Sequence, residues 1–456
     1  MIARETALKA LGAYRRDKLW PKDYFSGLAD NSTVHPSETA LAMQIAKGVL
    51  QNMTLIDYCI AQFSSIALKK LEPRVHDILR MSVYQLAFLT RIPPSAAVNE
   101  GVALAKKYSN PKAAGFVNAV LRKAATASEN GSLMKIEAET EQRRLSIEYS
   151  HPEWFVREVF SILGFEGAEA FLKANNASDT PITAQINTLR SNIDDALNIM
   201  RADGAQVSPH IWLENCAELF NTGRIANMEA YKKGLFYVQD AAARLAVAAA
   251  SPKPGDFVID GCAAPGGKSF AAAIAMENTG RVISFDITDT KLSRIRDGAR
   301  RLGLCNIETL KSDASVRDEN FFTCADIVFA DVPCSGFGVI RKNPEIRYKT
   351  EKDIEGLPYL QESILSNLSG YVQPEGTLIY STCTILKREN EDVVESFLSS
   401  HKEFCLEEFN LPAFGRVKGG MITLWPHKHG TDGFFICRLK RLGIGMSADG
   451  GLRVRK

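Results

Sequence analysis

The sequence predicts a multidomain protein in which an all-α helical bundle is followed by a small α/β subdomain and then by a larger α/β domain built on a parallel sheet. Three observations lead to this prediction. The chain has 456 residues, which is too many for one ordinary core. Apolar residues recur at helical spacing up to about residue 125, whereas short β-rich runs alternate with helical segments after Pro254. The expected divisions are 1–135 for the bundle, 136–240 for the subdomain, 241–441 for the larger domain and 442–456 for a flexible tail.

The first region is expected to form a bundle of about five or six helices with short connections. One segment places Ala3, Ala7 and Leu11 on a single helical face, and a later segment does the same with Val75 and Ile78. The helix breaks are expected at 31–36, 93–94 and 110–111, where residues that favour helix ends, such as Asn and Pro, occur together.

Positive charge is concentrated in this first region. Residues 1–135 hold 18 lysines and arginines against 10 acidic residues, a net charge of +8, and the rest of the chain sums to −6. A basic bundle fits a surface that binds the phosphates of a nucleic acid. Small helical domains are also often mildly basic without binding nucleic acid, so charge alone leaves both interpretations open.

The middle of the chain carries mixed signals, for which a small α/β subdomain is the simplest prediction. A polar linker at 126–132 precedes a charged helix at 137–148. Beyond it, the pattern predicts helices at 154–163 and 167–174 and extended segments at 182–186 and 207–213.

Five β-rich runs follow Pro254, and each ends at or within two residues of a Gly, Asp or Cys. Their alternation with helical segments predicts a parallel sheet with helices on both faces. Such a sheet binds its ligand at the carboxyl ends of the strands, near the switch in strand order. The runs are 257–263, 281–286, 307–313, 326–332 and 377–383.

Several classes of protein are disfavoured. The N-terminus carries charges every few residues and no apolar stretch is long enough to cross a membrane, so a cytoplasmic protein is expected. The nine cysteines show neither paired CxxC spacing nor a nearby His cluster. The sequence therefore predicts no metal site and no disulfide framework.

A small-residue turn follows the first β-rich run and is the candidate cofactor site. Gly266 and Gly267 would let the backbone approach a ligand, and Pro265 is foreign to the dinucleotide fingerprint of dehydrogenases. Asp286 lies about 20 residues further on, where a carboxylate holds ribose hydroxyls, and Asp313 is placed to meet the adenine side. A turn that only packs a helix is the alternative. The candidate cofactor contacts are Cys262, Ala263, Ala264, Pro265, Gly266, Gly267, Lys268, Asp286, Asp313 and Asp331.

Two cysteines stand at the ends of the fourth and fifth β-rich runs. Adjacent strand ends would bring Cys334 and Cys383 over one pocket. A free thiol is only slightly ionised at neutral pH, so a reactive cysteine needs an electropositive or hydrogen-bonded setting, which Lys268 or a helix N-terminus could supply. Taken singly, a buried cysteine is more often a small hydrophobic residue, and we assign that role to the other cysteines outside the small-residue turn.

Together these residues resemble the RsmB/Sun and nucleolar-protein group of RNA cytosine-5 methyltransferases. The resemblance covers residues 150–440 and implies a Rossmann-like methyltransferase domain that uses S-adenosyl-L-methionine. The motifs that carry it are Cys262 to Lys268, Asp286, Asp313, Asp331-Val-Pro-Cys334-Ser-Gly, Val339 to Pro344, Ser381-Thr-Cys383 with Glu389-Asn-Glu391, and Pro426 to Phe434.

The resemblance implies catalytic roles for two cysteines, and the residues themselves suggest roles for Asp331 and Lys268. Cys383 matches the nucleophile that adds to carbon 6 of the cytosine, because carbon 5 is too poor a nucleophile to take the methyl group unaided. Cys334 matches the cysteine that assists release of the product. Asp331 could bond the N3 or amino edge of the base, although it could instead cap the following turn. Lys268 completes the predicted catalytic set.

The helical region is similar to the NusB fold, and this pairing implies 16S ribosomal RNA as the substrate. The target cytosine must be unpaired or flipped out to be reached. Arg341 and Lys342 are expected to contact phosphates and Asn343 to make a polar contact, although solvated loop residues would look the same. We expect a monomer. A tRNA cytosine-5 methyltransferase and a catalytically silent ribosome-assembly or antitermination factor are the alternatives.

Overall fold

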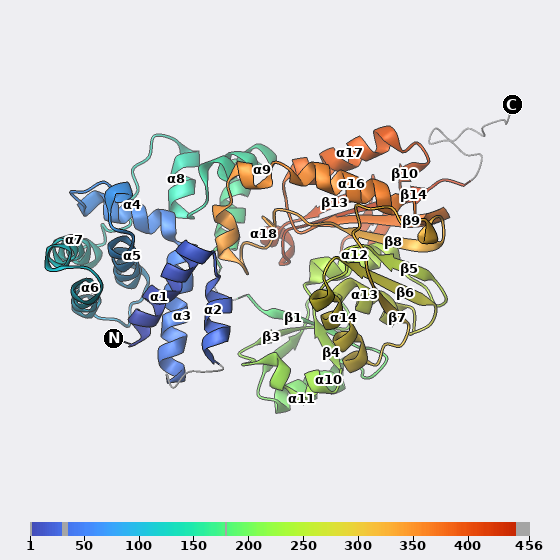
Figure 1. Ribbon diagram of the computed structural model, residues 1–456, viewed down its shortest axis with the longest axis horizontal. Coiled ribbons are helices and arrows are strands. Elements are labelled where there is room, and N and C mark those ends of the chain that lie inside the picture. The colour runs from blue at the N-terminus through green and yellow to red at the C-terminus, as the bar shows by residue number, and fades with distance from the viewer. Residues whose placement is uncertain (1, 30–34, 178–179, 444–456) are drawn as a thin grey trace. The chain divides into compact units, whose positions relative to one another are not determined.

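A computed structural model of the protein describes residues 2–29, 35–177 and 180–443 (Figure 1). It forms two compact units, one made of residues 1–176 together with 343–350 and the other of 177–342 together with 351–456. Most of the helix break predicted at 31–36 and most of the predicted tail lie outside the described residues. Among the helices that are described, none is both long and apolar enough to cross a membrane.

The first unit is all-α, as predicted. Pro94 and Pro111 each occupy the first turn of a helix, which confirms the breaks expected at 93–94 and 110–111. The prediction of five or six helices was too low for the described part of this region, because α3 and α4 are separated only by Asn52, without a Pro or Gly to mark the boundary. The helices are α1 (Ile2–Asp17), α2 (Pro21–Ala29), α3 (Pro36–Gln51), α4 (Met53–Phe63), α5 (Pro73–Phe88), α6 (Pro94–Tyr108), α7 (Pro111–Glu129), α8 (Glu141–Glu148) and α9 (Glu153–Asn175).

Helices α7 and α9 of this unit differ in detail from the prediction. The two helices expected at 154–163 and 167–174 form one element, α9, which is interrupted at Gly164 with φ +69°. Glycine is the residue that takes this conformation without strain. The predicted polar linker at 126–132 is partly helical, because α7 continues to Glu129.

A short segment from the second half of the chain completes the first unit. The 3-10 turn η4 (Pro344–Tyr348) places Arg347 at 0% exposure. Arg347 Nη1 donates to the carbonyl oxygens of Gln51 (2.7 Å), Tyr149 (3.2 Å) and Ser150 (3.3 Å), and to Asn176 Oδ1 (2.9 Å). Burial lowers the pKa of Arg347 to about 10, so the guanidinium is still charged at neutral pH.

The second unit begins with a four-stranded antiparallel sheet in the order β2-β3-β1-β4. The extended segment predicted at 182–186 is confirmed as β1. The segment predicted at 207–213 is extended only to Pro209, because the chain turns at His210, whose Nδ1 accepts from the Leu213 backbone N–H (3.1 Å). The elements are β1 (Ile182–Ile186), α10 (Ile193–Ala202), β2 (Gln206–Pro209), β3 (Cys216–Phe220), α11 (Glu229–Lys232) and β4 (Phe236–Val238).

The larger sheet of this unit has the order β10-β14-β9-β8-β5-β6-β7, with β13 paired to β14. All five predicted strands are present and pair in parallel, and β14 continues the sheet antiparallel to β9. The antiparallel strands were not predicted. The strands are β5 (Phe257–Asp260), β6 (Arg281–Asp286), β7 (Ile307–Lys311), β8 (Ala325–Asp331), β9 (Val372–Thr382), β10 (Phe404–Leu406), β13 (Met421–Leu424) and β14 (Phe434–Arg441), and β11 (Phe409–Leu411) pairs separately with β12 (Gly415–Val417).

Helices cover both faces of this sheet, as predicted. One core cluster joins Val258 to α12, α13 and α14, and another joins the next residue, Ile259, to α16 and α17 (Figure 1). Strand β5 lies in the middle of the sheet. The chain first adds β6 and β7 on one side of β5 and then returns to add β8 and β9 on the other side, and this reversal opens a crevice at the carboxyl ends of β5 and its neighbours. The helices are α12 (Ala241–Ala250), α13 (Gly267–Ala275), α14 (Asp289–Leu302), α15 (Glu351–Ile354), α16 (Leu357–Ser369), α17 (Glu391–Ser400) and α18 (Pro426–His429).

Candidate active site

A pocket of about 430 Å³ opens at the carboxyl ends of the parallel strands. Its size is in the range of ligand pockets. Residues at or just beyond the ends of all five strands contribute to its lining, and the lining includes seven of the predicted site residues: Cys262, Ala264, Asp286, Asp313, Asp331, Cys334 and Cys383.

The small-residue turn forms one wall of this pocket, and its glycines also meet packing constraints inside the unit. Gly266 has φ +107°, and a Cβ there would lie 2.6 Å from the Phe270 ring. A Cβ on Gly267 would lie 2.9 Å from the Gln239 side-chain nitrogen. The backbone conformation and the Phe270 ring therefore favour glycine at 266, whereas a side chain at 267 would have to displace the Gln239 amide. Cys262 and Ala264 line the pocket, whereas five predicted cofactor contacts are not among its lining residues: Ala263, Pro265, Gly266, Gly267 and Lys268.

Two carboxylates face the pocket from the ends of β6 and from just beyond β7. Asp286 is buried, with Oδ1 accepting from the Thr288 N–H (3.1 Å). Asp313 accepts from the N–H and hydroxyl of Ser315 (2.9 and 2.7 Å), and these bonds hold its pKa below the usual range. Asp313 is therefore ionised at neutral pH. Carboxylates at these two strand ends fit the hydroxyls and base of a nucleoside ligand.

Lys268 is committed to Asp331 rather than to either thiol in this structure. Its Nζ lies 2.5 Å from Asp331 Oδ2 and 5.2 Å from the centre of the Phe434 ring. The other carboxylate oxygen, Asp331 Oδ1, accepts from the Ser381 hydroxyl (2.7 Å). Among the described interactions, Lys268 makes no direct contact with Cys383. The electropositive setting predicted for this thiol therefore does not come from a direct contact with Lys268. What Lys268 does is fix the Asp331 carboxylate at the pocket wall.

The two predicted thiols meet, with Cys334 Sγ 3.1 Å from Cys383 Sγ. Their hydrogen bond, and then burial, raise the pKa of the Cys334 thiol well above its usual value. Cys334 therefore keeps its proton at neutral pH and can donate it to Cys383 Sγ. The pair forms because β8 and β9 are neighbouring parallel strands, with Asp331 opposite Ser381.

A buried glutamate holds the two cysteine loops together. Glu389 Oε2 accepts from the Ser335 N–H (2.8 Å) and from Gln361 Nε2 (2.9 Å), and the Ser335 hydroxyl bonds Thr384 Oγ1 (2.8 Å). Ser335 and Thr384 directly follow the two cysteines in the chain. The sequence motif contains Glu389 but gave it no role, because its charged neighbours Lys387, Arg388 and Glu391 make it look like one of several surface charges.

Replacing Glu389 with glutamine is expected to slow the reaction. The substitution can place an amide N–H₂ group against the two donors that now bond Glu389, which are the Ser335 N–H and the Gln361 Nε2 group. Donors that face one another repel, so the cysteine loops must shift. Displacements near 1 Å at reacting groups cost about 10²-fold in rate. We expect kcat to fall by about 10- to 100-fold with KM little changed, measured by steady-state kinetics. Glu395→Gln, on the exposed side of α17, is the matched control, and equal rates in both variants would refute the positioning role.

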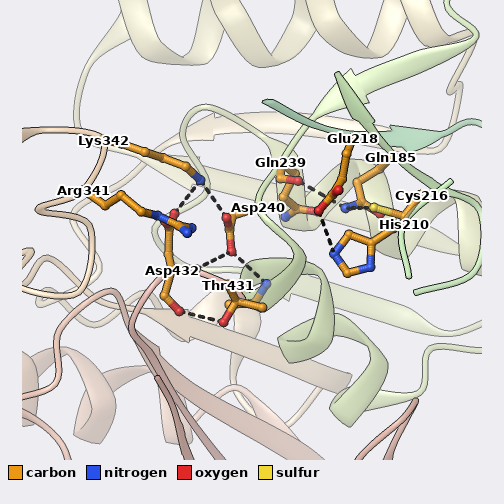
Figure 2. Close-up of polar contacts among 11 residues, drawn as sticks. Gln185, His210, Cys216, Glu218, Gln239, Asp240, Arg341, Lys342, Thr431 and Asp432 are labelled. Atoms are coloured by element: carbon orange, nitrogen blue, oxygen red, sulfur yellow. Dashed lines mark hydrogen bonds and ion pairs between the residues drawn. The ribbon is translucent and has the colours of Figure 1, made fainter. Parts of the chain in front are cut away.

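Arg341 and Lys342, the predicted phosphate contacts, have acidic partners inside the unit (Figure 2). Lys342 Nζ lies 2.6 Å from Asp240 Oδ2 and 2.7 Å from Asp432 Oδ2, and Arg341 Nη2 lies 3.4 Å from Asp432 Oδ1. Burial raises the pKa of Asp432 to about 6, although Lys342 opposes that shift. Both positive charges are compensated here, so contact with phosphate stays a prediction for these two residues and for Asn343. The partners were not foreseeable because they are about 90 to 100 residues away in sequence.

Buried Asp260, at the end of β5, gives stability an unusual pH dependence. Burial and, to a smaller extent, nearby Asp331 raise its pKa from 3.8 to about 6, against the opposing effects of Ser269 and Lys268. The folded state binds this proton more tightly than the unfolded state, so ionisation of Asp260 destabilises the fold as pH rises from about 4 to 6.

Asp260→Asn cannot ionise at this position. We expect its free energy of unfolding, relative to that of the unaltered protein, to increase by about 3 kcal/mol between pH 4 and pH 7.5. Urea unfolding at both pH values measures this difference. A difference that does not change with pH would contradict the assignment.

Within the described ranges, no group of three or more His, Cys, Asp or Glu side chains is arranged to hold a metal ion.

Comparison with known proteins covers most of the chain. Residues 247–440 match the family described as 16S rRNA methyltransferase RsmB/F, residues 1–126 match the NusB family, and residues 151–226 match the ferredoxin-like domain of RsmF/B-like methyltransferases. A curated protein of Bacillus subtilis, the probable ribosomal RNA small subunit methyltransferase B, is 35% identical over 447 residues, which are 96% of this chain and 99% of that protein.

Solved structures are similar over the same regions. The crystal structure of PH0851 is 26% identical and has a TM-score of 0.77, covering 96% of this chain and 98% of its own. A methyltransferase homologue from Pyrococcus horikoshii is 25% identical with a TM-score of 0.56, covering 67% of this chain and 100% of its own.

Proposed function

The chain belongs to the ribosomal RNA small subunit methyltransferase B family, and from this premise we propose that it methylates carbon 5 of one cytosine in 16S ribosomal RNA, with Cys383 as the nucleophile. The observation that carries the proposal is the pair of thiols, 3.1 Å apart, at the edge of a pocket with carboxylates at its strand ends. A reaction that proceeds through a covalent thiol adduct would use one of these thiols as the nucleophile and the other in product release.

The pocket suits S-adenosyl-L-methionine as the cofactor. Asp286 and Asp313 would take the ribose and adenine ends, and Cys262 and Ala264 would form the wall of the turn. When bound there, this cofactor supplies an electrophilic methyl group.

Cys383 acts first in the proposed reaction. Its sulfur gives up its proton to solvent and forms a bond to carbon 6 of the cytosine, and the ring electrons move to carbon 5, which becomes nucleophilic and can take the methyl group. Asp331, held by Lys268 and Ser381, accepts a hydrogen bond from the amino edge of the base and so orients it. The base must be unpaired or flipped out to reach both groups.

Cys334 acts in product release. The carbon 5 proton is lost to solvent, the electrons of that bond re-form the ring double bond, and the Cys383–C6 bond breaks with its electron pair on sulfur. Cys334, which stays protonated, lies close enough to donate a hydrogen bond to the departing thiolate.

The proposed reaction is tested by incubating the purified protein with methyl-labelled S-adenosyl-L-methionine and naked 16S ribosomal RNA, followed by bisulfite sequencing. We expect label at one cytosine, retained as 5-methylcytosine. Label in tRNA instead would remove the substrate assignment and leave the chemistry. Cofactor binding with no methyl transfer to any RNA would favour a silent assembly factor. A ribosomal RNA substrate also implies that the reaction takes place in the cytoplasm.

Cys334→Ala is expected to trap the covalent adduct. Loss of the thiol donor slows departure of Cys383 more than its attack, so protein–RNA adduct should accumulate to a large fraction of the enzyme. A denaturing gel shows the adduct as a band of reduced mobility. The double variant with Cys383→Ala should show no such band, and an adduct that survives in it would disprove this assignment of roles.

A further inference from the structure

A second pocket, about 480 Å³ in volume, lies in the same unit and shares no lining residue with the candidate active site. It lies between the four-stranded sheet and helices α12 and α13, and it is at least as large as the proposed cofactor pocket. No role has been assigned to it so far. Its lining includes Gln185, Ile186, Trp212, Tyr237, Arg244 and Ile274.

Two polar side chains in this pocket lack partners. Tyr237 is 3% exposed, and its hydroxyl forms no hydrogen bond with any residue that the structure describes. Burial raises the pKa of that hydroxyl, so it is a neutral donor at physiological pH. The half-buried guanidinium of Arg244, on α12, likewise has neither a hydrogen bond nor an ion pair within the described ranges. Both residues line the pocket, where a ligand that carries an acceptor group could reach their donors.

The rest of the lining is aromatic and aliphatic. Trp212 forms one wall and is itself supported by edge contacts with His210 (4.4 Å between ring centres) and Phe414 (5.0 Å). Ile186 and Ile274 contribute apolar surface. An aromatic wall with one unpaired cation suits a planar ring that carries one anionic group.

Gln185, which lines this pocket, offers a ligand only an acceptor group. Its Nε2 is already used by Cys216 Sγ (3.3 Å) and by the Gln239 carbonyl oxygen (3.1 Å), as Figure 2 shows, which leaves its Oε1 as an acceptor. Glu214 is exposed at the rim and adds a negative charge there. One guanidinium beside one carboxylate disfavours a polyphosphate and leaves room for a single phosphate.

We propose that this pocket binds one nucleoside monophosphate unit, with the phosphate at Arg244 and the base against Trp212. The unit could come from an internal nucleotide of the RNA, which rests on the proposed function, or from a free mononucleotide, which does not. Both sources present the same chemistry to the pocket, and the experiment below separates them.

The test is isothermal titration of the full chain with 5′-CMP, 5′-AMP and inorganic phosphate. Saturating S-adenosylhomocysteine keeps the probes out of the first pocket. We expect millimolar or tighter binding of a mononucleotide, weakened by about tenfold in Arg244→Gln and by a smaller factor in Tyr237→Phe. Arg300→Gln, which alters an exposed arginine paired with Asp297, is the matched control and should bind as the unaltered protein does.

Displacement of the bound mononucleotide by a single-stranded RNA oligonucleotide would assign the site to RNA, whereas binding without displacement would assign it to free nucleotides. No mononucleotide binding at millimolar concentration, or equal binding by Arg244→Gln, would overturn the proposal. If the variants fail to fold, hydrogen exchange of the unaltered protein decides, because 5′-CMP should protect residues 237–248. None of these readouts measures methyl transfer, so failure here and failure of the proposed reaction are separable.

Discussion

Methyl transfer is expected to fall by at least about 10⁴-fold when Cys383 is replaced by alanine. Without the sulfur, no bond forms to carbon 6, and carbon 5 of the cytosine stays too electron-poor to take a methyl group. Cys334 cannot replace it, because its pKa is raised well above the usual range and it stays a thiol. Single-turnover transfer of labelled methyl groups to 16S ribosomal RNA measures the loss.

The interpretation of this variant depends on two controls. Cys305→Ala alters an exposed thiol and should retain full activity. Cofactor binding by Cys383→Ala should be unchanged, since a collapsed pocket would also explain a lost rate. If Cys383→Ala keeps activity and Cys334→Ala abolishes it, the two roles are reversed.

Replacing Arg347 with alanine is expected to destabilise the first unit by about 3 kcal/mol or more. The substitution leaves a cavity and deprives the carbonyl oxygens of Gln51, Tyr149 and Ser150, together with Asn176 Oδ1, of one shared donor. Each buried acceptor without a partner costs about 1–3 kcal/mol. Urea unfolding followed by far-ultraviolet circular dichroism, which weights this helical unit, measures the change.

A matched surface variant separates this effect from loss of charge. Arg157→Ala removes an arginine from α9 whose side chain is 60% exposed and 3.8 Å from Glu153, and exposed ion pairs contribute little. We expect it to change stability by less than about 1 kcal/mol. A similar change in both variants would mean that the bonds of Arg347 are not what holds the segment in place.

Much of the larger domain follows directly from sequence patterns. Each β-rich run after Pro254 becomes a parallel strand. The central strands β5, β6 and β8 show the apolar run that a buried strand needs, whereas β7 is a largely exposed strand at the sheet edge. Since neighbouring parallel strands end at the same edge, the meeting of Cys334 and Cys383 could also be predicted from their positions alone. The acids Asp286 and Asp313 line the pocket for the same reason.

The sequence did not predict the ion pairs that form between residues far apart in the chain. Lys342 appeared to be a loop cation available to RNA, but Asp240 and Asp432 lie beside it only after the chain has folded. Lys268 appeared to be a neighbour of Cys383, yet its ammonium group is taken by Asp331. Local patterns cannot reveal such partners, because nothing in a residue's own neighbourhood encodes a contact about 60 to 100 residues away.

The position of residues 343–350 in the first unit has a consequence for biosynthesis. During synthesis on the ribosome, residues 1–176 emerge long before Arg347 does. Until Arg347 has been translated, the carbonyl groups that it bonds in the folded protein, such as that of Gln51, lack this donor. At bacterial elongation speeds the delay is roughly 10 to 35 seconds. During that interval the nascent helical unit is incomplete, and it is the stage at which a chaperone or a protease would have most access to it.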